Sequence, residues 1–228
     1  MLISVTDRKM VSGVEAPGTM KGDPPRAHTY DWRTTGPGNT RGVRAYFGVC
    51  DLHDALSATY GTDAHLVTYV LTRDGEPVDP HPRINKSALS WLDGEGFEVS
   101  AGVLMADVDN PGHAAWTPDM LSGFRSRWLT DPAPGAGVYL TAHGYRLVQP
   151  LDEPVSVAIV ERYIAAWHAE LRSAGIEPDS HCRDWTRLYR LPNVLRAGQP
   201  YVSPYIDLSR MRPRVIHPID PPKGEAVA

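Results

Sequence analysis

The spacing of apolar and polar residues along the chain predicts an alternation of short strands and helices. Apolar runs rich in β-branched and aromatic residues favour strands, and apolar residues recurring every three or four positions favour helices. Strands are predicted over residues 43–49, 65–72, 99–108, 138–141, 145–148, 188–191 and 201–206, and helices over 51–60, 86–92, from Thr117 onward and from Ser156 to Gly175. This order predicts one mixed α+β domain.

The clearest unit is the apolar strand Val99–Val108 and the helix that follows it. The breakers Asn110, Pro111 and Gly112 end the strand. Thr117 can then accept hydrogen bonds as an N-cap, with a proline at the first helical position. We therefore expect the end of this strand to lie beside a sharply defined loop.

Composition divides the chain into three parts. Residues 1–42 are rich in Gly, Pro and polar side chains and predict an irregular N-terminal arm. Residues 43–212 contain the apolar periodicity of the core domain, and residues 213–228 form a proline-rich tail. We expect one domain with an irregular segment at each end.

Overall composition favours a globular cytoplasmic protein. Hydrophobic residues make up 42% of the chain, which is enough for one substantial core. No apolar run approaches the ~20 residues of a membrane-spanning helix, and the N-terminus lacks the pattern of a secretory signal. Two cysteines do not predict a disulfide framework. We expect no membrane partner.

Charge is distributed unevenly, although the net charge is only −4. Residues 50–110 contain eleven acidic and three basic side chains, whereas residues 180–214 contain seven arginines and two aspartates. An acidic part beside an arginine-rich part suits a site where metal ions meet phosphates. Charge counts by themselves favour the simpler interpretation of two unrelated solvated faces.

Two aspartates, Asp107 and Asp109, end the apolar strand. Side chains two apart on a strand point to the same face, so these carboxylates are predicted to project together. Two anions so close repel unless a cation lies between them, and Mg²⁺ or Mn²⁺ prefers oxygen ligands. The pair predicts a metal site, with two solvated loop aspartates as the simpler alternative.

The segment 138–148 offers groups that bind phosphate. It contains Thr141, His143 and Gly144 at a passage between two strands, followed by Arg146. Histidine can donate to a phosphate oxygen, and arginine can contact one through two parallel hydrogen bonds. The simpler interpretation is an ordinary hairpin with a surface histidine.

A third segment, residues 176–193, adds a carboxylate and two arginines. Asp179 and Asp184 are the two candidate carboxylates, and Arg187 and Arg190 follow at a spacing that lets both face one ligand. Surface ion pairs of small energetic value are the alternative.

Together the three segments resemble the archaeo-eukaryotic primase superfamily, specifically the primase-polymerases of plasmids, phages and other mobile elements. Asp107-Val108-Asp109 matches that family's Asp-x-Asp motif. Thr141-Ala142-His143 matches the hydroxyl-x-His motif, whereas the hydroxyl-x-x-Gly-x-His form of the motif would place Arg146 at the histidine position. For the hydrophobic-Asp motif Asp179 is favoured, with Asp184 as the rival.

The same stretch contains Arg187-Leu188-Tyr189-Arg190-Leu191-Pro192, which is similar to the Arg-x-x-Arg-Leu-Pro sequence of mobile-element members. The resemblance spans residues 99–193. It implies a primase catalytic core with an RRM-like mixed sheet and a smaller N-terminal α/β part.

The resemblance also implies template-directed nucleotidyl transfer from NTPs or dNTPs with Mg²⁺ or Mn²⁺. Asp107, Asp109 and Asp179 would be the catalytic metal ligands, and the nucleotide would be bound by His143, Arg146, Arg187 and Arg190. Expected partners are single-stranded DNA or a primer-template, and a helicase or replication initiator. The alternatives are a non-catalytic nucleic-acid- or nucleotide-binding replication protein of the same fold, and a metal-dependent nuclease.

Overall fold

The computed structural model describes residues 1–7 and 46–219, and these residues form two compact units. Of the described residues, unit 1 contains 1–7, 46–100 and 186–201, and unit 2 contains 101–185 and 202–219. The chain therefore passes between the units three times, and neither unit is a continuous segment. Each unit is described by itself below.

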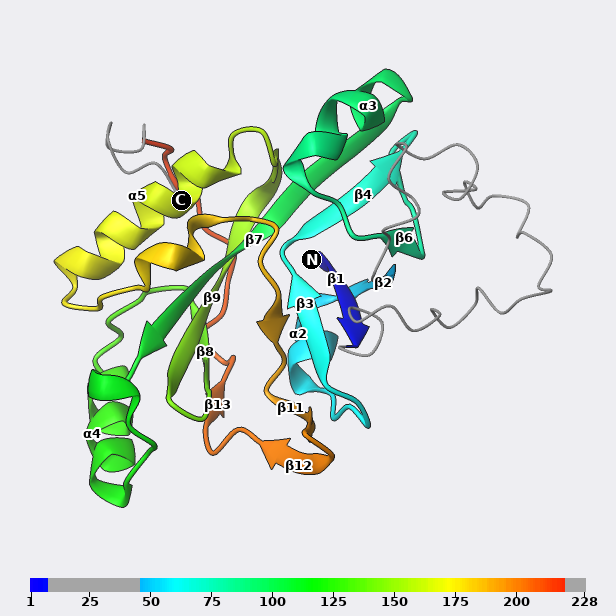
Figure 1. The fold of residues 1–228 in the computed structure, drawn as a ribbon. Coiled ribbons are helices and arrows are strands. Elements are labelled where there is room, and N and C mark those ends of the chain that lie inside the picture. Colours follow the sequence, from blue (N-terminus) through cyan, green and yellow to red (C-terminus); the bar gives the residue numbers. More distant parts are fainter. Residues whose placement is uncertain (8–45, 220–228) are drawn as a thin grey trace. The chain divides into compact units, whose positions relative to one another are not determined.

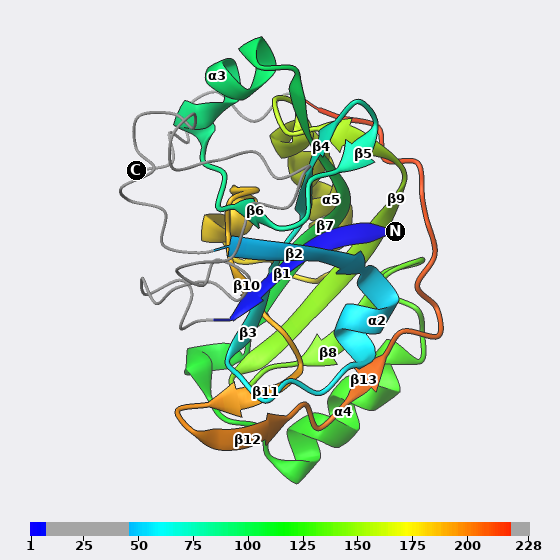
Figure 2. The same ribbon diagram turned by 90° about the vertical axis from the view of Figure 1, so that its right-hand side faces the viewer.

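Unit 1 is built on a five-stranded sheet in the order β10-β3-β1-β2-β6. Its paired strands are antiparallel, and β1 lies in the centre of the sheet (Figure 2). The strands are β1 (Leu2–Asp7), β2 (Tyr46–Asp51), β3 (Ala64–Val67), β6 (His81–Pro82) and β10 (Tyr189–Arg190).

The other elements of unit 1 are short. Asp51 caps helix α2, because its carboxylate accepts hydrogen bonds from the backbone N–H groups of His53 and Asp54. These elements are α2 (Leu52–Ser57), β4 (Tyr69–Arg73), β5 (Glu76–Pro77), η2 (Lys86–Ala88), α3 (Leu89–Gly94), β11 (Asn193–Arg196) and β12 (Gln199–Val202).

Unit 2 contains strands in the order β13-β8-β9-β7, and β7 enters it from unit 1. Strand β8 pairs antiparallel with both β9 and β13. Its elements are β7 (Phe97–Asp109), η3 (Pro111–His113), α4 (Pro118–Trp128), β8 (Gly137–Leu140), β9 (Gly144–Ser156), α5 (Val160–Ser173), η4 (Ser180–Arg183) and β13 (Ile206–Asp207).

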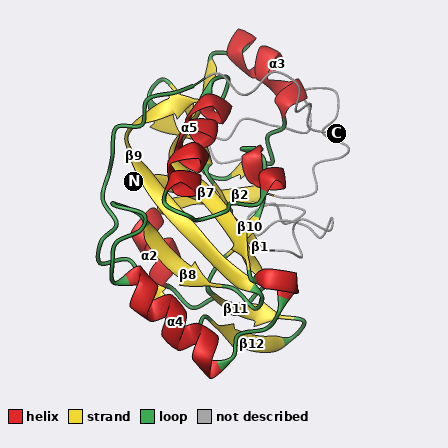
Figure 3. Cartoon of the chain, turned by 90° about the vertical axis from the view of Figure 1, so that its left-hand side faces the viewer, coloured by secondary structure: helices red, strands yellow, loops and turns green. Residues whose placement is uncertain are grey.

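Helices α4 and α5 lie on one face of this sheet, as Figures 1 and 3 show. Each helix buries a tryptophan, Trp128 in α4 and Trp167 in α5. Residues 103–106 of β7 are buried on both faces, and burial of large apolar side chains is the main stabilising term of such a core. This core fixes where β7 ends, and so where its two aspartates lie.

The predicted α+β class is confirmed, with antiparallel pairing in both units. Thr117 caps α4 as expected, since its hydroxyl accepts from the backbone N–H of Met120 at 3.2 Å. The strand predicted at residues 65–72 is instead two strands, β3 and β4, separated at Thr68. The strand predicted at residues 145–148 extends to Ser156 in β9, and α5 consequently begins only at Val160.

The two predicted end segments differ from the structure where residues are described. Leu2–Asp7, assigned to the irregular arm, forms the central strand of a sheet, and the rest of that arm lies outside the described residues. Arg214, in the predicted tail, forms a parallel bridge with Leu151, and Ile216 is buried. Backbone pairing of this kind is not visible in composition. Within the described ranges, no helix combines the length and apolarity that crossing a bilayer requires.

Two buried histidines, His81 and His168, should make the stability of the chain depend on pH. Burial lowers the pKa of His81 to about 4, and burial together with the charge of Arg172 does the same for His168, from an ordinary value of 6.5. The unfolded chain therefore binds more protons than the folded chain between pH 6.5 and 4. The contribution of the two histidines to the free energy of unfolding is fully present above pH 6.5. It falls as the pH decreases, by up to about 1.4 kcal/mol per pH unit for each histidine.

The measurement is the midpoint temperature of unfolding across this pH range. His168→Leu replaces the titrating ring with an apolar side chain, so we expect a shallower decline in that variant. A midpoint that stays constant from pH 6.5 to 4.5 in the natural chain would contradict the prediction.

Candidate functional site

The last residues of β7 bring Asp107 and Asp109 to the surface of unit 2. The Asp107 side chain is 18% exposed and the Asp109 side chain 44% exposed, whereas Val108 between them is buried. This alternation is what a strand requires when two carboxylates leave the core on the same face. His113, four residues on, lies with Nδ1 3.5 Å from Oδ1 of Asp109.

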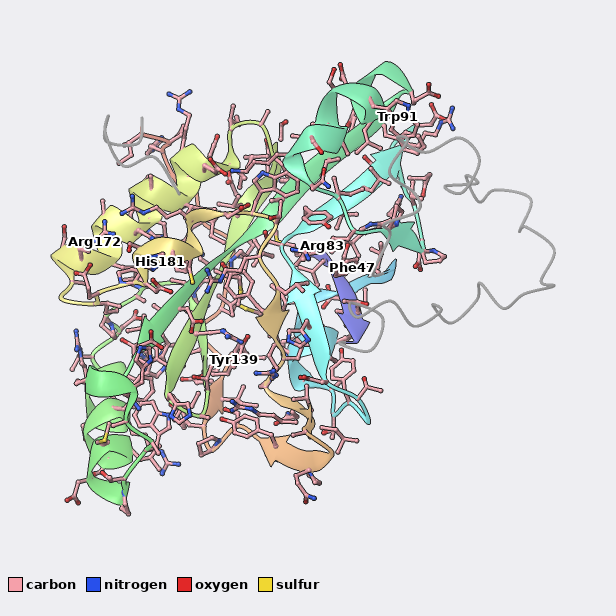
Figure 4. The ribbon with its side chains drawn as sticks, in the orientation of Figure 1. Phe47, Arg83, Trp91, Tyr139, Arg172 and His181 are labelled. Atoms are coloured by element: carbon pink, nitrogen blue, oxygen red, sulfur yellow. The ribbon has the colours of Figure 1, made fainter. Side chains whose placement is uncertain are left out.

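A guanidinium contacts the first of these carboxylates. Arg146 Nη2 donates to Oδ2 of Asp107 at 3.2 Å, and the Arg146 side chain is only 14% exposed. Burial opposes the charge of Arg146, but Tyr139 and Asp107 favour it, and the resulting pKa lies above the ordinary arginine value. Tyr139, labelled in Figure 4, belongs to β8. It is the cross-strand partner of Arg146 on β9. Arg146 therefore stays charged and neutralises Asp107.

The turn that carries His143 packs directly on the end of β7. The backbone N–H of Asn110 donates to the carbonyl of His143 at 2.7 Å. At Gly144 a Cβ would lie 2.1 Å from the carbonyl oxygen of Val108 and 2.9 Å from Cα of Asp109. Only glycine allows this approach, which leaves the His143 side chain exposed beside the aspartate strand.

Trp116 holds the other side of this turn. Its indole N–H donates to the carbonyls of Thr141 at 2.9 Å and Gly144 at 3.2 Å, and its ring packs edge-on against Phe124 of α4 at 5.6 Å. Sequence reasoning did not identify this residue. The available signal was its position directly before the N-cap Thr117, which ties it to the start of a helix.

Asp179 reaches the same strand through its backbone. Its N–H donates to the carbonyl of Asp107 at 2.8 Å. Its carboxylate accepts from the backbone N–H of His181, and the Nδ1 atom of the His181 ring lies 2.9 Å from the same oxygen. Asp184 follows the end of η4. Asp179 is tied by its backbone to the strand of Asp107, and the choice between Asp179 and Asp184 stays a prediction.

Arg187 and Arg190 belong to unit 1, whereas the three aspartates, His143 and Arg146 belong to unit 2. Arg190 forms two hydrogen bonds with the carboxylate of Asp63, at 2.6 and 3.3 Å. Both groups are mostly buried. In the structure this arginine has a structural role, and its predicted contact with a nucleotide stays a prediction.

Among the described residues, no three His, Cys, Asp or Glu side chains are grouped so that they could hold a metal ion. A magnesium ion does not require such a group, because it keeps several waters and is bound by one or two carboxylates together with substrate phosphates. Asp109 and the second oxygen of Asp107 offer this ligand type. The β7 pair therefore fits Mg²⁺ or Mn²⁺ that arrives with a nucleotide.

Comparisons with known proteins give little further information. No protein-family model matches the chain, and no curated protein matches it. Among solved structures, the chain is similar to the archaeo-eukaryotic primase domain of the cyanophage S-2L primase-polymerase, with 14% sequence identity and a TM-score of 0.32. The match covers 59% of this chain and 77% of the other. A TM-score at this level does not establish a common fold.

Proposed function

We propose that this chain is the catalytic core of a primase-polymerase of the archaeo-eukaryotic primase type. It joins NTPs or dNTPs on a single-stranded DNA template or a primer-template, with Mg²⁺ or Mn²⁺. A helicase or replication initiator is the expected further partner. The RRM-like sheet of this family corresponds in the proposal to the strands of unit 2 and its two covering helices.

One observation carries the proposal. The three segments that resemble the family's motifs are separated in sequence; the first is the end of β7 itself, and the second and third both contact that end. Arg146 contacts the Asp107 carboxylate, Asn110 binds the His143 carbonyl, and the Asp179 N–H binds the Asp107 carbonyl. Sheet pairing places the second segment beside β7, and the third returns to the same strand end after helix α5. Their meeting is what a site built from all three motifs requires.

In this mechanism Asp107 and Asp109 would hold a divalent metal together with the nucleotide phosphates, and Asp179, which contacts Asp107 through its backbone, would be the third carboxylate of the motif set. A divalent metal bound there would supply positive charge that stabilises an in-line displacement at phosphorus. His143 is exposed and can donate to a phosphate oxygen of the triphosphate. Arg146 orients Asp107 and limits the negative charge of the carboxylate pair. The 3′-hydroxyl attacks the α-phosphate, and pyrophosphate leaves.

The contact between Arg146 and Asp107 also favours a second function. A guanidinium that already neutralises an aspartate can replace the cation at that position. The chain would then be a non-catalytic replication protein that binds nucleic acid or nucleotide. The two functions differ in whether divalent metal changes a covalent product.

The test is incorporation of labelled dNTP or NTP on a primed single-stranded template and on an unprimed one. We expect extension with Mg²⁺ or Mn²⁺ and none after chelation with EDTA, with activity returning when metal is added back. Products are separated on a denaturing gel, so that a longer strand, an unchanged strand and a shortened strand are distinguished.

Each outcome decides between the candidates. Tight binding of template or nucleotide without extension, across several templates and both metals, would reject the polymerase and support the binding protein. Metal-dependent shortening of the template would instead identify a nuclease.

A further inference from the structure

Three neighbouring strands of unit 2 place Tyr139, Arg146 and Asp107 in one row. The strands lie in the order β8-β9-β7, and Tyr139 on β8 pairs in register with Arg146 on β9. On the other side, the Arg146 guanidinium donates to the Asp107 carboxylate on β7. Cross-strand partners point to the same face of a sheet, so the three side chains share one face. The sheet therefore fixes the guanidinium between its two neighbours.

Arg146 is a permanent positive charge beside the carboxylate pair. Its side chain is only 14% exposed, Tyr139 is buried, and Nη2 of Arg146 lies 3.2 Å from Oδ2 of Asp107. A guanidinium stays protonated at every pH at which a protein is folded. A mostly buried side chain on a paired strand has few alternative rotamers, because the surrounding atoms are closely packed. The charge therefore stays beside Asp107.

This charge changes what the carboxylate pair can bind. Among the described residues, Arg146 is the one whose side chain donates to the Asp107 carboxylate, and the neighbour of the Asp109 carboxylate is the exposed His113. With the guanidinium included, the pair carries one net negative charge instead of two. A divalent cation bound by these groups alone would leave excess positive charge in a partly buried place, where like charges repel more strongly than in water.

A triphosphate removes that excess. Its phosphate oxygens bring several negative charges, which attract both a divalent cation and a guanidinium. Magnesium is commonly bound in this way, by one or two carboxylates together with the phosphates of a substrate. The groups at the end of β7 therefore favour a cation and a phosphate chain together over either ligand by itself.

We infer that Arg146 makes the binding of divalent metal depend on phosphate. This role rests on the proposed function and adds a form of regulation to the same site. Arg146 weakens the binding of a free Mg²⁺ or Mn²⁺ ion and strengthens the binding of a triphosphate. The resulting coupling is reciprocal, since each ligand changes the affinity of the chain for the other by the same factor. The chain then takes up metal with its nucleotide and not before it.

The test compares the natural chain with Arg146→Gln, which removes the charge and keeps a polar side chain. Electron paramagnetic resonance measures free Mn²⁺ during a titration without nucleotide. Calorimetry measures the binding of inorganic tripolyphosphate in EDTA, without metal. We expect Arg146→Gln to bind Mn²⁺ at least about tenfold more tightly and tripolyphosphate at least about tenfold more weakly. Neither measurement depends on strand extension.

The opposite signs of the two changes separate this role from a structural one. A variant with a damaged fold would bind both ligands more weakly, and a thermal unfolding curve would identify it. Arg146→Lys keeps the charge, so it should retain weak binding of Mn²⁺. Arg214→Gln is the matched control, because Arg214 pairs with Glu170 at 3.0 Å, outside the carboxylate pair. It should leave both affinities unchanged.

The natural chain provides a measurement that needs no variant. Tripolyphosphate should bind at least about tenfold more tightly with saturating Mg²⁺ than in EDTA, because each ligand favours the other. Equal binding under the two conditions would contradict the coupling, even if Arg146→Gln did not fold.

The inference is overturned if folded Arg146→Gln binds Mn²⁺ no more tightly than the natural chain, or if its affinity for tripolyphosphate is unchanged. Failure of the proposed function gives a different pattern. In that case the two affinities shift in opposite directions as expected, but no strand is extended. If strands are extended while both affinities of Arg146→Gln equal those of the natural chain, the proposed function stands and the inference fails.

Discussion

Gly144→Ala is expected to abolish nucleotide incorporation and to lower stability substantially. The added methyl carbon would lie 2.1 Å from a backbone carbonyl oxygen of Val108, and neither the turn nor β7 has a flexible side chain that could yield. Overpacking of this kind costs about 3 kcal/mol or more. A displacement of about 1 Å in a catalytic arrangement can reduce the rate about 100-fold, so residual folded protein should also be inactive.

Thermal unfolding and primer extension measure the two effects. A loss of about 3 kcal/mol corresponds to a decrease of roughly 10 °C in the unfolding midpoint of a chain of this size. Gly94→Ala in helix α3 is the matched control, because a Cβ there meets no atom within 4 Å. If the Gly144→Ala variant has the unfolding midpoint and the incorporation rate of the natural chain, the turn does not pack on β7 as the structure describes.

Asp109→Asn should reduce metal-dependent incorporation by about 100-fold or more, because it removes a charged ligand from the transition state. The fold should be retained. The side chain is 44% exposed and its described ion-pair neighbour is the exposed His113, so the change in unfolding free energy should stay within about 0.5 kcal/mol. Steady-state incorporation at a series of Mn²⁺ concentrations, together with a thermal unfolding curve, measures both quantities.

Glu153→Gln on β9 is the control for loss of an exposed carboxylate, and it should leave incorporation unchanged. Asp107→Asn is less selective, since it also leaves the mostly buried Arg146 without its carboxylate partner and should lower stability as well. If Asp109→Asn extends primers at the natural rate, the metal ligands lie elsewhere and the assignment of the β7 pair is wrong.

The part of the fold that the sequence predicts well is the strand before the aspartates and the helix after them. β7 is long and apolar on both faces, its end is followed by Asn110, Pro111 and Gly112, and Thr117 has the chemistry of an N-cap. These signals are local, so they do not depend on the rest of the fold. The position of the carboxylate pair at the strand end follows from them.

Strands whose buried positions are polar were harder to predict. β1 is only six residues long and buries Ser4 and Thr6 beside Ile3, so it lacks an apolar alternation. β9 continues through Pro150 and Pro154, and prolines inside an apolar run normally argue against a strand. In both cases pairing with neighbouring strands determines the structure, and that pairing is set by residues far away in sequence.

The meeting of the three motifs could be inferred only by resemblance. No local pattern predicts that the Asp179 N–H reaches the Asp107 carbonyl, or that Gly144 lies against Val108. The role of Trp116 depends in the same way on tertiary contacts. Residue types indicated the chemistry of the site, whereas its distances required the structure.

The pairing of β10 with β3 has a consequence for synthesis on the ribosome. Arg190 follows its partner Asp63 by 127 residues, so the outer edge of β3 has no strand to pair with while most of the chain is being made. An open edge is a template for pairing with another chain. Nascent chains are therefore most prone to aggregate before residue 190 emerges, and slower translation of the preceding segment should lower the yield of native protein.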